Sequence, residues 1–283
     1  MASEARVVVR RHAWPVRLMH WINVLAVSVL FFSGLGIFNA YSQLHWGRAS
    51  YATGAPLLLD ISARERDDGH LVGITRVLGH EFDTTGWLGV SAGPDNQPTA
   101  RAFPGWLTLP SGQWLAMSRA WHLFFAWVFV INGACYLVFT LASGHLRRDL
   151  WPSRTDWRSI GRSVRDHLRL RHPRGEAALR YNVLQKLSYL MVVFVLLPGI
   201  ALCGMAMSPR LDALAPGWVD VLGGRDAART LHFVFAWLLV AFVAVHLFEV
   251  LVSGPFNQLR SMITGRYAVA DPPPAAGHDA RAP

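Results

Sequence analysis

The chain alternates between long uncharged stretches and polar segments. Asp, Glu, Lys and Arg are absent from four stretches of the sequence, at residues 18–47, 120–146, 187–209 and 230–248. A run of about 18 or more uncharged, mostly apolar residues is long enough to cross a bilayer as a helix. We therefore expect four membrane-spanning helices, at residues 16–38, 118–143, 182–207 and 228–252.

The polar segments define the rest of the chain. Residues 1–15 form a basic arm, and residues 268–283 form a Pro/Ala-rich tail that we expect to be disordered. Residues 39–117 form a long loop whose Gly, Pro and aromatic residues favour a folded cap. Residues 144–181 form a basic loop, with a surface helix expected near residues 155–171.

The composition excludes several classes of protein. The chain is 52% hydrophobic and 16% charged, whereas soluble domains have about 25% charged residues. A soluble enzyme, a disordered chain and a disulfide scaffold are therefore excluded, and a membrane β-barrel would show alternating segments of about 10 residues. We expect Cys135 and Cys203 to be packed rather than bonded to each other. The fold class is all-α integral membrane, a four-helix bundle within residues 16–267.

Arginine is distributed unevenly between the loops, and this bias predicts the orientation in the membrane. Residues 144–181 contain ten Arg and four acidic residues, whereas residues 42–117 contain five Arg and seven acidic residues. Arg-rich loops stay in the cytoplasm. We expect both termini and residues 144–181 to be cytoplasmic, and residues 42–117 and 209–227 to face outside. The net charge of +9 is then explained without a nucleic-acid partner.

Three of the expected helices begin with an arginine one turn before a histidine. The motifs are Arg17-x-x-His20 in helix one, Arg119-x-x-His122-x-x-Phe125-Ala126-Trp127 in helix two and Arg229-x-x-His232-x-x-Phe235-Ala236-Trp237 in helix four. A further histidine, His246, follows in helix four. Ionisable residues at membrane depth are costly and mark functional sites.

The expected orientation distributes the four histidines over two depths. On an ideal helix, His232 and His246 are separated by about 21 Å along the axis and by about 40° around it, so they share one face. Helix one begins inside, whereas helices two and four begin outside. We therefore expect His20 to meet His246 near the cytoplasmic face and His122 to meet His232 near the outer face.

Paired imidazoles suit the two axial positions of an iron porphyrin, and ligation by two histidines favours electron transfer. Zinc would need three or four protein ligands close together. A hydrogen-bonded core histidine and a proton relay remain the other interpretations, but the joint geometry favours haem. Since no C-x-x-C-H motif occurs, we predict two non-covalent haem b groups, with iron between His20 and His246 and between His122 and His232.

The three arginines fit the same interpretation. Haem has two propionates that turn toward water, and an arginine one turn closer to the surface can pair with a carboxylate. Arg17, Arg119 and Arg229 are therefore expected to contact haem. The alternative, an arginine that extends to the membrane interface, applies most to Arg17.

On these residues the chain resembles the di-haem cytochrome b subunits of nickel–iron hydrogenases and membrane formate dehydrogenases, within the bacterial cytochrome b561 superfamily. The resemblance covers residues 12–267 and rests on Arg17-Leu-Met-His20-Trp21 and on the spacing of His232 and His246. Two further motifs resemble a cytochrome b/b6-domain subgroup that is commonly paired with a molybdopterin oxidoreductase. They are Tyr181-Asn182-x-x-Gln185-Lys186-x-x-Tyr189 and Met262-Ile263-Thr264-Gly265-Arg266-Tyr267.

The resemblance implies a bacterial inner membrane location and exchange of electrons with membrane quinone near one haem. The candidate quinone residues at the cytoplasmic level are Asn182, Gln185, Lys186 and Glu249. Quinone reduction consumes protons, which a carboxylate or a lysine near water can supply. Lys186 and Glu249 can instead be simple helix-end residues.

The leading hypothesis is an electron-transfer subunit. Its outer haem would exchange electrons with a redox partner, such as a molybdopterin oxidoreductase, docked on the long outer loop. Its inner haem would exchange electrons with the quinone pool. The alternatives are a stand-alone, quinone-coupled superoxide oxidase of the cytochrome b561 type and a haem-free proton or ion transporter.

Overall fold

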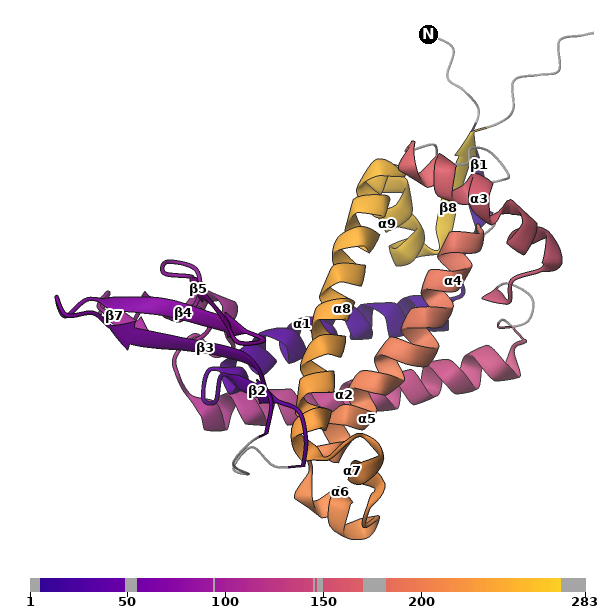
Figure 1. Cartoon of the computed structure of the whole chain (residues 1–283). Helices are drawn as coiled ribbons and strands as arrows, with labels where there is room; N and C mark the ends of the chain where they lie inside the picture. The colour runs from indigo at the N-terminus through magenta and orange to yellow at the C-terminus, as the bar shows by residue number, and fades with distance from the viewer. Residues whose placement is uncertain are drawn as a thin grey trace, which may run out of the picture. The chain divides into compact units, whose positions relative to one another are not determined.

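Four long apolar helices dominate the protein. The computed structural model describes residues 6–48, 55–93, 95–144, 146, 150–169 and 182–270. The four helices that are long and apolar enough to cross a membrane are α1 (Trp14–Phe38), α2 (Leu115–Ala142), the third span (Val183–Ala206) and α8 (Arg225–Val252). They are labelled in Figure 1. The expectation of a four-helix integral membrane protein is confirmed.

The third span is not a uniform α-helix. It consists of α4 (Val183–Met191), a wider π-helical turn η4 (Val192–Leu196) and α5 (Leu197–Ala206). Pro198 follows directly in the first turn of α5. A proline cannot donate to the carbonyl four residues earlier, and its ring clashes with that carbonyl, so the preceding turn widens.

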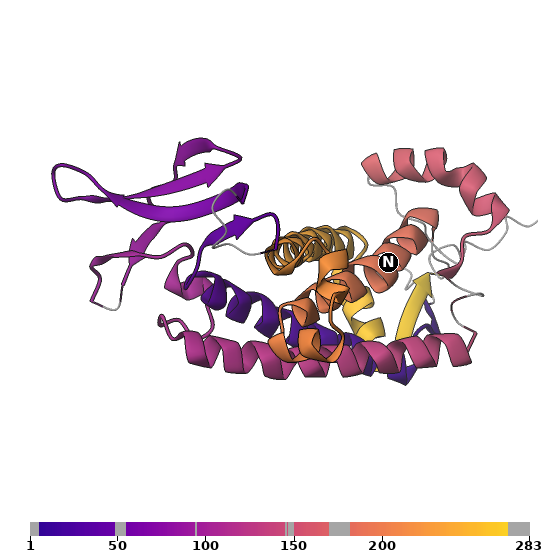
Figure 2. The same ribbon diagram turned by 60° about the horizontal axis from the view of Figure 1, so that its bottom comes forward.

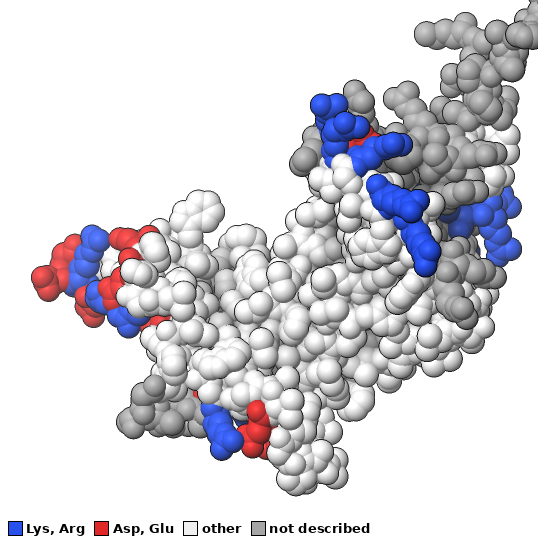
Figure 3. Space-filling model, turned by 45° about the vertical axis from the view of Figure 1, so that its right-hand side comes forward, with Lys and Arg blue, Asp and Glu red and all other residues white. Residues whose placement is uncertain are grey.

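Most apolar side chains of these helices point outward. At most 22% of the most apolar window of each helix is buried within the protein. In Figure 3 the helical surface is white, whereas charged side chains gather over α3 and at the hairpin ends of the sheet. Helices that expose apolar residues around their circumference are stable in lipid and costly in water. Cys135 belongs to this exposed surface, contrary to the expectation that it packs, whereas Cys203 is buried; both are free.

Residues 39–114, which we call the cap, contain strands in their described part. An antiparallel sheet has the order β2 (Gln43–His45), β3 (Leu57–Glu65), β4 (Leu71–Val77) and β5 (His80–Asp83). A hairpin of β6 (Val90–Ala92) and β7 (Pro98–Ala100) and a short 3-10 turn, η1 (Gly105–Leu107), follow. The strands of the sheet lie side by side in both ribbon views (Figures 1 and 2). A sheet is thus added to the helical membrane domain.

Smaller elements complete the chain. They are β1 (Arg6–Arg10), α3 (Arg154–Leu168), α6 (Pro209–Leu214), α7 (Trp218–Val221), α9 (Pro255–Thr264) and β8 (Arg266–Ala270). β1 pairs with β8 in antiparallel register, with Val8 opposite Ala268. The basic arm therefore contains a strand, and the segment 268–270, expected to be disordered, belongs to its partner strand. Residues 271–283 lie outside the described residues.

The chain divides into two compact units. The first unit comprises Met1–His20, Cys135–Phe194 and Ala241–Pro283, and the second comprises Trp21–Ala134 and Val195–Val240. Each of the four spans contributes residues to both units. The cap belongs entirely to the second unit, and α3, α9 and the β1–β8 pair belong to the first.

The core of the second unit joins the cap to α1. Leu35 and Phe38 of α1 pack with Leu44 of β2, Ile61 of β3 and Phe103. A second cluster joins Ala26 of α1 to Phe125 and Phe129 of α2. These clusters pack α1 against the cap and against α2, the helix that carries His122.

Hydrogen bonds fasten the cap at two points of the second unit. The Asn39 amide donates to the Phe103 carbonyl at 3.0 Å and accepts from the Phe103 N–H at 2.7 Å. At the start of α8, the Ala227 N–H donates to the Gly47 carbonyl at 3.1 Å, and the Thr230 hydroxyl donates to the His45 carbonyl at 2.8 Å. The first N–H groups of a helix have no partner within it, so the cap supplies one.

We predict that Asn39→Ala loosens the cap. The substitution removes both bonds to Phe103 and leaves a partly buried N–H and C=O unpaired, at about 1–3 kcal/mol for each unmade bond. Asn39→Asp keeps the acceptor and loses the donor, so its effect should be intermediate. Limited proteolysis of the cap and thermal unfolding measure the effect. A cap that is equally resistant in wild type and Asn39→Ala would contradict this role.

Candidate functional site: two pairs of histidines

The four histidines within the spanning helices come together in two pairs. In the second unit, the ring centroids of His122 on α2 and His232 on α8 are 6.1 Å apart, with an angle of 65° between ring planes. In the first unit, the centroids of His20 on α1 and His246 on α8 are 6.4 Å apart, at 59°. The structure thus brings together the same partners that the depth argument pairs. Helix α8 supplies one histidine to each pair.

These separations match two imidazoles that share one metal ion. A metal–imidazole bond of about 2.0–2.1 Å and ring bonds of about 1.33 Å put the centroids of two trans imidazoles about 6.3 Å apart. Both observed separations lie within about 0.2 Å of this value. Among the described residues, no three His, Cys, Asp or Glu side chains are grouped to hold a metal together. The ligand geometry is therefore one of pairs.

The hydrogen bonds of His122 and His232 fix which ring nitrogen is available to a metal. Nδ1 of His122 lies 3.1 Å from the Leu30 carbonyl of α1, and Nδ1 of His232 lies 2.9 Å from the Ile200 carbonyl of α5. A carbonyl only accepts, so Nδ1 is the protonated nitrogen in both rings. Nε2 keeps its lone pair and can bind a metal, and a bonded Nδ1–H is typical of metal-ligating histidines.

Two glycines leave room for these rings. A Cβ at Gly34 of α1 would lie 3.4 Å from Cε1 of His122, and a Cβ at Gly204 of α5 would lie 3.3 Å from Cε1 of His232. Longer side chains at either position would displace the imidazole. Small residues let neighbouring membrane helices approach closely, and here they do so beside the candidate ligands.

The pair in the first unit has an aromatic neighbour. The ring of Phe242, one turn before His246 on α8, stacks on the His246 ring with centroids 5.9 Å apart and 17° between planes. The aromatic ring of Phe242 thus lines one side of the His246 imidazole.

The three arginines that precede the histidines lie in three different environments. Arg17 donates to the Ile263 carbonyl near the end of α9, where a cation also complements the helix dipole. Arg229 donates to the Tyr41 carbonyl of the cap, and its guanidinium lies 4.6 Å from the Tyr41 ring centroid. Arg119 is exposed. Two of the three are thus held by protein groups.

The candidate quinone residues have structural partners. Asn182 and Gln185 form a reciprocal capping box at the start of α4, with the Asn182 side chain accepting from the Gln185 N–H at 2.9 Å. Lys186 pairs with Asp156 of α3 at 2.9 Å. Glu249 lies 3.8 Å from Nε2 of His167, also on α3. The candidates therefore occupy one region of the first unit, at the contacts of α3.

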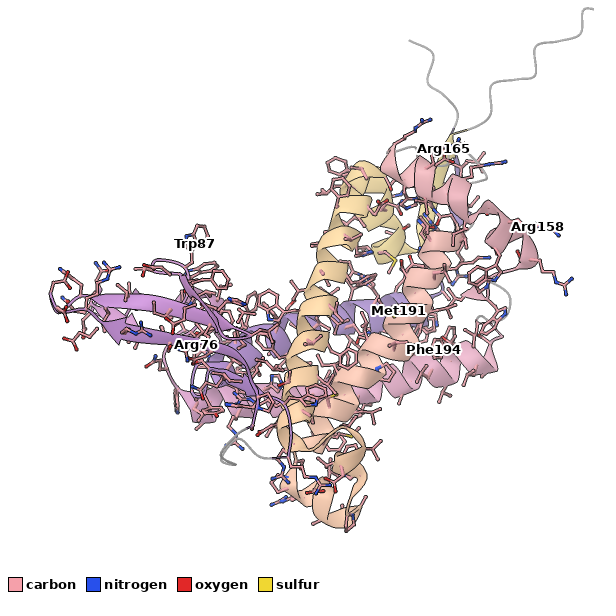
Figure 4. All side chains as sticks on the ribbon, in the orientation of Figure 1. Arg76, Trp87, Arg158, Arg165, Met191 and Phe194 are labelled. Carbon is pink, nitrogen blue, oxygen red and sulfur yellow. The ribbon has the colours of Figure 1, made fainter. Side chains whose placement is uncertain are left out.

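The Lys186–Asp156 pair is electrostatically favourable. Burial alone would raise the pKa of the Asp156 carboxyl, but the hydrogen bonds from Lys186 and Ser153 outweigh it and hold the pKa below its ordinary value. A depressed carboxyl pKa contributes stability at neutral pH, which is lost as the pH falls through the folded-state pKa. Arg158 and Arg165 project outward from α3 (Figure 4), whereas Asp156 and His167 attach it.

Sequence reasoning missed several of these partners. It did not find Ser33, whose Oγ lies 3.1 Å from Nδ1 of His122, or the glycines beside the rings. It also missed Asp156 and His167. The available signals were the small pair Ser33-Gly34 recurring as Cys203-Gly204, and the spacing of 11 residues that puts Asp156 and His167 on one helix face.

The geometry describes a membrane protein that offers paired imidazoles to a metal within a four-helix domain. The family model described as prokaryotic cytochrome b561 matches residues 11–265, so the chain belongs to the prokaryotic cytochrome b561 family. It is a b-type haem-binding, multi-pass membrane protein of electron transport.

A curated relative comes from Azospira oryzae and bears the name "Putative protein-methionine-sulfoxide reductase subunit YedZ1". The two proteins are 33% identical over 139 residues, which is 48% of this chain and 65% of the relative. The match thus spans slightly less than two thirds of the relative's length. No solved structure matches the chain.

We predict that Gly204→Val weakens haem binding. Its additional methyl groups would meet the His232 ring, which already lies 3.3 Å from a Cβ at this position. Disturbing the surroundings of a ligand typically lowers affinity about 10–100-fold. Gly133→Val on α2 is the matched control, because nothing lies within 4 Å of a Cβ there. Haem per polypeptide, measured as the pyridine haemochrome, should fall only in Gly204→Val. Equal haem content in both variants would contradict the role of Gly204.

Proposed function

We propose that this chain carries electrons across the membrane through two non-covalent b haems. His122 and His232 ligate one haem, and His20 and His246 ligate the other. The observation that carries the proposal is the separation of the ring centroids, 6.1 Å and 6.4 Å, which suits one iron between each pair. When bound, haem b supplies a centre that accepts and releases one electron at a time.

The residues around each pair favour electron transfer over chemistry at iron. Each pair of imidazoles would hold one haem iron, and ligation by two histidines favours electron transfer over binding of a small ligand. The Nδ1–H groups of His122 and His232 donate to carbonyls of α1 and α5. These bonds limit movement of the two rings when a bound iron would gain or lose an electron. Arg119, which is exposed, is the arginine best able to pair with a haem propionate, while Arg17 and Arg229 can add a second bond from guanidinium groups already positioned by carbonyls.

The uneven distribution of arginine between the loops supports one orientation of the chain in the membrane. With both termini in the cytoplasm, His20 and His246 ligate the haem of the cytoplasmic side and His122 and His232 ligate that of the outer side. The membrane is then the bacterial inner membrane, as for a prokaryotic cytochrome b561. The cap faces outward in this orientation.

A redox protein on the outer face is the proposed partner of the haem between His122 and His232. The cap is a folded sheet with strongly exposed aromatic side chains, including Trp87 and Trp106. The relative from Azospira oryzae is named as a reductase subunit, which supports a role beside a separate catalytic subunit. A molybdopterin oxidoreductase is the partner class that we propose.

Membrane quinone is the proposed reactant on the cytoplasmic side. Lys186 and Glu249 both contact α3. Lys186 follows the capping residue Asn182 by four residues, and Glu249 follows the candidate ligand His246 by three residues. The Lys186 ammonium can donate a hydrogen bond to a quinone carbonyl oxygen, and the Glu249 carboxylate can accept one from a quinol hydroxyl. Asn182 and Gln185 shape the same region by fixing the start of α4.

We predict that His232→Ala and His246→Ala each remove one haem. The first should lose the haem shared with His122, and the second the haem shared with His20, because each iron would lose one of two protein ligands. Pyridine haemochrome stoichiometry should fall from two haems per polypeptide to one in both variants. His80→Ala, an exposed histidine of β5, is the control and should keep both haems.

The two single variants also test the pairing. Their reduced spectra and potentials should differ, since each retains a different haem. Loss of both haems from either variant, in a protein that remains folded, would refute the assignment in pairs. Complete absence of haem from the wild-type protein would favour the transporter hypothesis instead.

We predict that Glu249→Gln slows reaction with quinone and leaves haem binding intact. The variant loses the carboxylate and its contact with His167 but keeps the size of the side chain. Haem reduction by a quinol analogue should slow about tenfold or more, as for loss of a group that handles protons. Reduction by dithionite should be unchanged. Asp166→Asn on α3 is the control. Equal quinol rates in wild type and Glu249→Gln would exclude Glu249 from the quinone site.

A further inference from the structure

The two histidines of the second unit contact the same combination of groups, a backbone carbonyl and a glycine, on two different helices. His122 bonds to the Leu30 carbonyl of α1 and faces Gly34, and His232 bonds to the Ile200 carbonyl of α5 and faces Gly204. In both helices the glycine follows the carbonyl by four residues, which is one helical turn. The segments Leu30-Phe-Phe-Ser33-Gly34 and Ile200-Ala-Leu-Cys203-Gly204 therefore correspond residue by residue.

The correspondence extends to the histidine helices. α2 and α8 share the pattern Arg-x-x-His-x-x-Phe-Ala-Trp, so the α1–α2 and α5–α8 pairs are two versions of one arrangement. The two versions differ at the residue before the glycine. Ser33 stands on the side of His122, and Cys203 stands at the corresponding position on the side of His232.

Ser33 is built to accept from His122. Its side chain is fully buried, and its Oγ lies 3.1 Å from Nδ1 of His122. The Ser33 hydroxyl donates to the Val29 carbonyl at 2.6 Å, so its lone pairs remain for the imidazole N–H. The His122 N–H is thereby shared between two oxygen acceptors, Ser33 and Leu30. A thiol at the same position, as in Cys203, accepts hydrogen bonds only weakly.

A bonded Nδ1–H makes imidazole a stronger donor to a metal on Nε2. A stronger donor favours the more oxidised metal and lowers its reduction potential. We propose that Ser33 is a positioning residue that makes His122 the stronger donor of this pair and lowers the midpoint potential of the iron centre between His122 and His232. Cys203 leaves His232 the weaker donor. This inference rests on the proposed ligation by His122 and His232.

Potentiometric titration of the purified haem protein tests the inference. Ser33→Ala and Ser33→Cys should both raise one midpoint potential, and Cys203→Ser should lower the same one. A tenfold change in the reduction equilibrium corresponds to about 59 mV for one electron. The exchanged double variant, Ser33→Cys with Cys203→Ser, should return close to the wild-type potential, because both imidazoles act on the same iron.

Ser28→Ala is the matched control. Ser28 lies on the same helix, and its hydroxyl donates to the carbonyl four residues earlier, that of Val24, at 2.7 Å. The substitution therefore removes the same kind of backbone bond without altering the His122 contact. Its potentials should equal those of wild type. Equal shifts in Ser28→Ala and Ser33→Ala, or a double variant whose midpoint potential stays as far from that of wild type as that of Ser33→Cys alone, would overturn the inference.

Haem content separates failure of this inference from failure of the proposed function. Full haem content with an unchanged potential in Ser33→Ala and in Cys203→Ser would refute only the role of the two residues. Retention of both haems in His122→Ala and in His232→Ala would refute the ligation itself. The low-spin ferric EPR signal gives a second readout, because loss of the Ser33 bond should change the orientation of the His122 ring.

Discussion

The functional arrangement depends on hydrogen bonds between imidazole N–H groups and helix carbonyls. In hydrocarbon an imidazole that is free to rotate can expose either nitrogen, and no water is present to satisfy the other one. The carbonyls of Leu30 and Ile200 remove that freedom, because each can only accept. Both carbonyls lie within helices. The helix's own hydrogen bond uses one lone pair of the carbonyl oxygen, and the second lone pair can accept from the imidazole. The backbone of one helix thus decides which nitrogen the next helix presents.

The cap and the helices of the second unit are interdependent. Phe38 and Leu35 bury their side chains against the cap, and the Asn39 amide closes the contact with two hydrogen bonds. At the start of α8, the Ala227 N–H and the Thr230 hydroxyl donate hydrogen bonds to carbonyls of the cap. Since His232 follows Thr230 by two residues, the cap helps to fix the helix turn from which this imidazole projects. The cap is therefore attached to the helix turn that carries His232, one of the residues that we propose as haem ligands.

The spanning helices and the histidine pairs could be predicted because each depends on a strong local pattern. Charge-free stretches mark the helices, and the 14-residue spacing of His232 and His246 specifies their common face. The sheet of the cap could not be predicted, because β2 and β5 are short and the longer strands β3 and β4 lack a clear alternation of buried and exposed positions. The environments of Arg17 and Arg229 were also out of reach. Their partners, the carbonyls of Ile263 and Tyr41, are backbone groups that any residue carries. Ligand roles for the histidines remain a proposal, supported by distances.

The π-helical turn Val192–Leu196 sets the rotational phase of α5. A π turn holds one residue more than an α turn over the same rise, so every later residue of the span is set back by about 100° around the axis relative to an uninterrupted α-helix. Ile200 and Gly204 owe their direction to that extra residue. Removing a single amino acid from this turn would swing the His232-facing carbonyl onto another side of the helix while leaving composition, length and hydropathy almost unchanged. The position of the carbonyl that bonds His232 therefore depends on the number of residues in a segment that has no polar side chain.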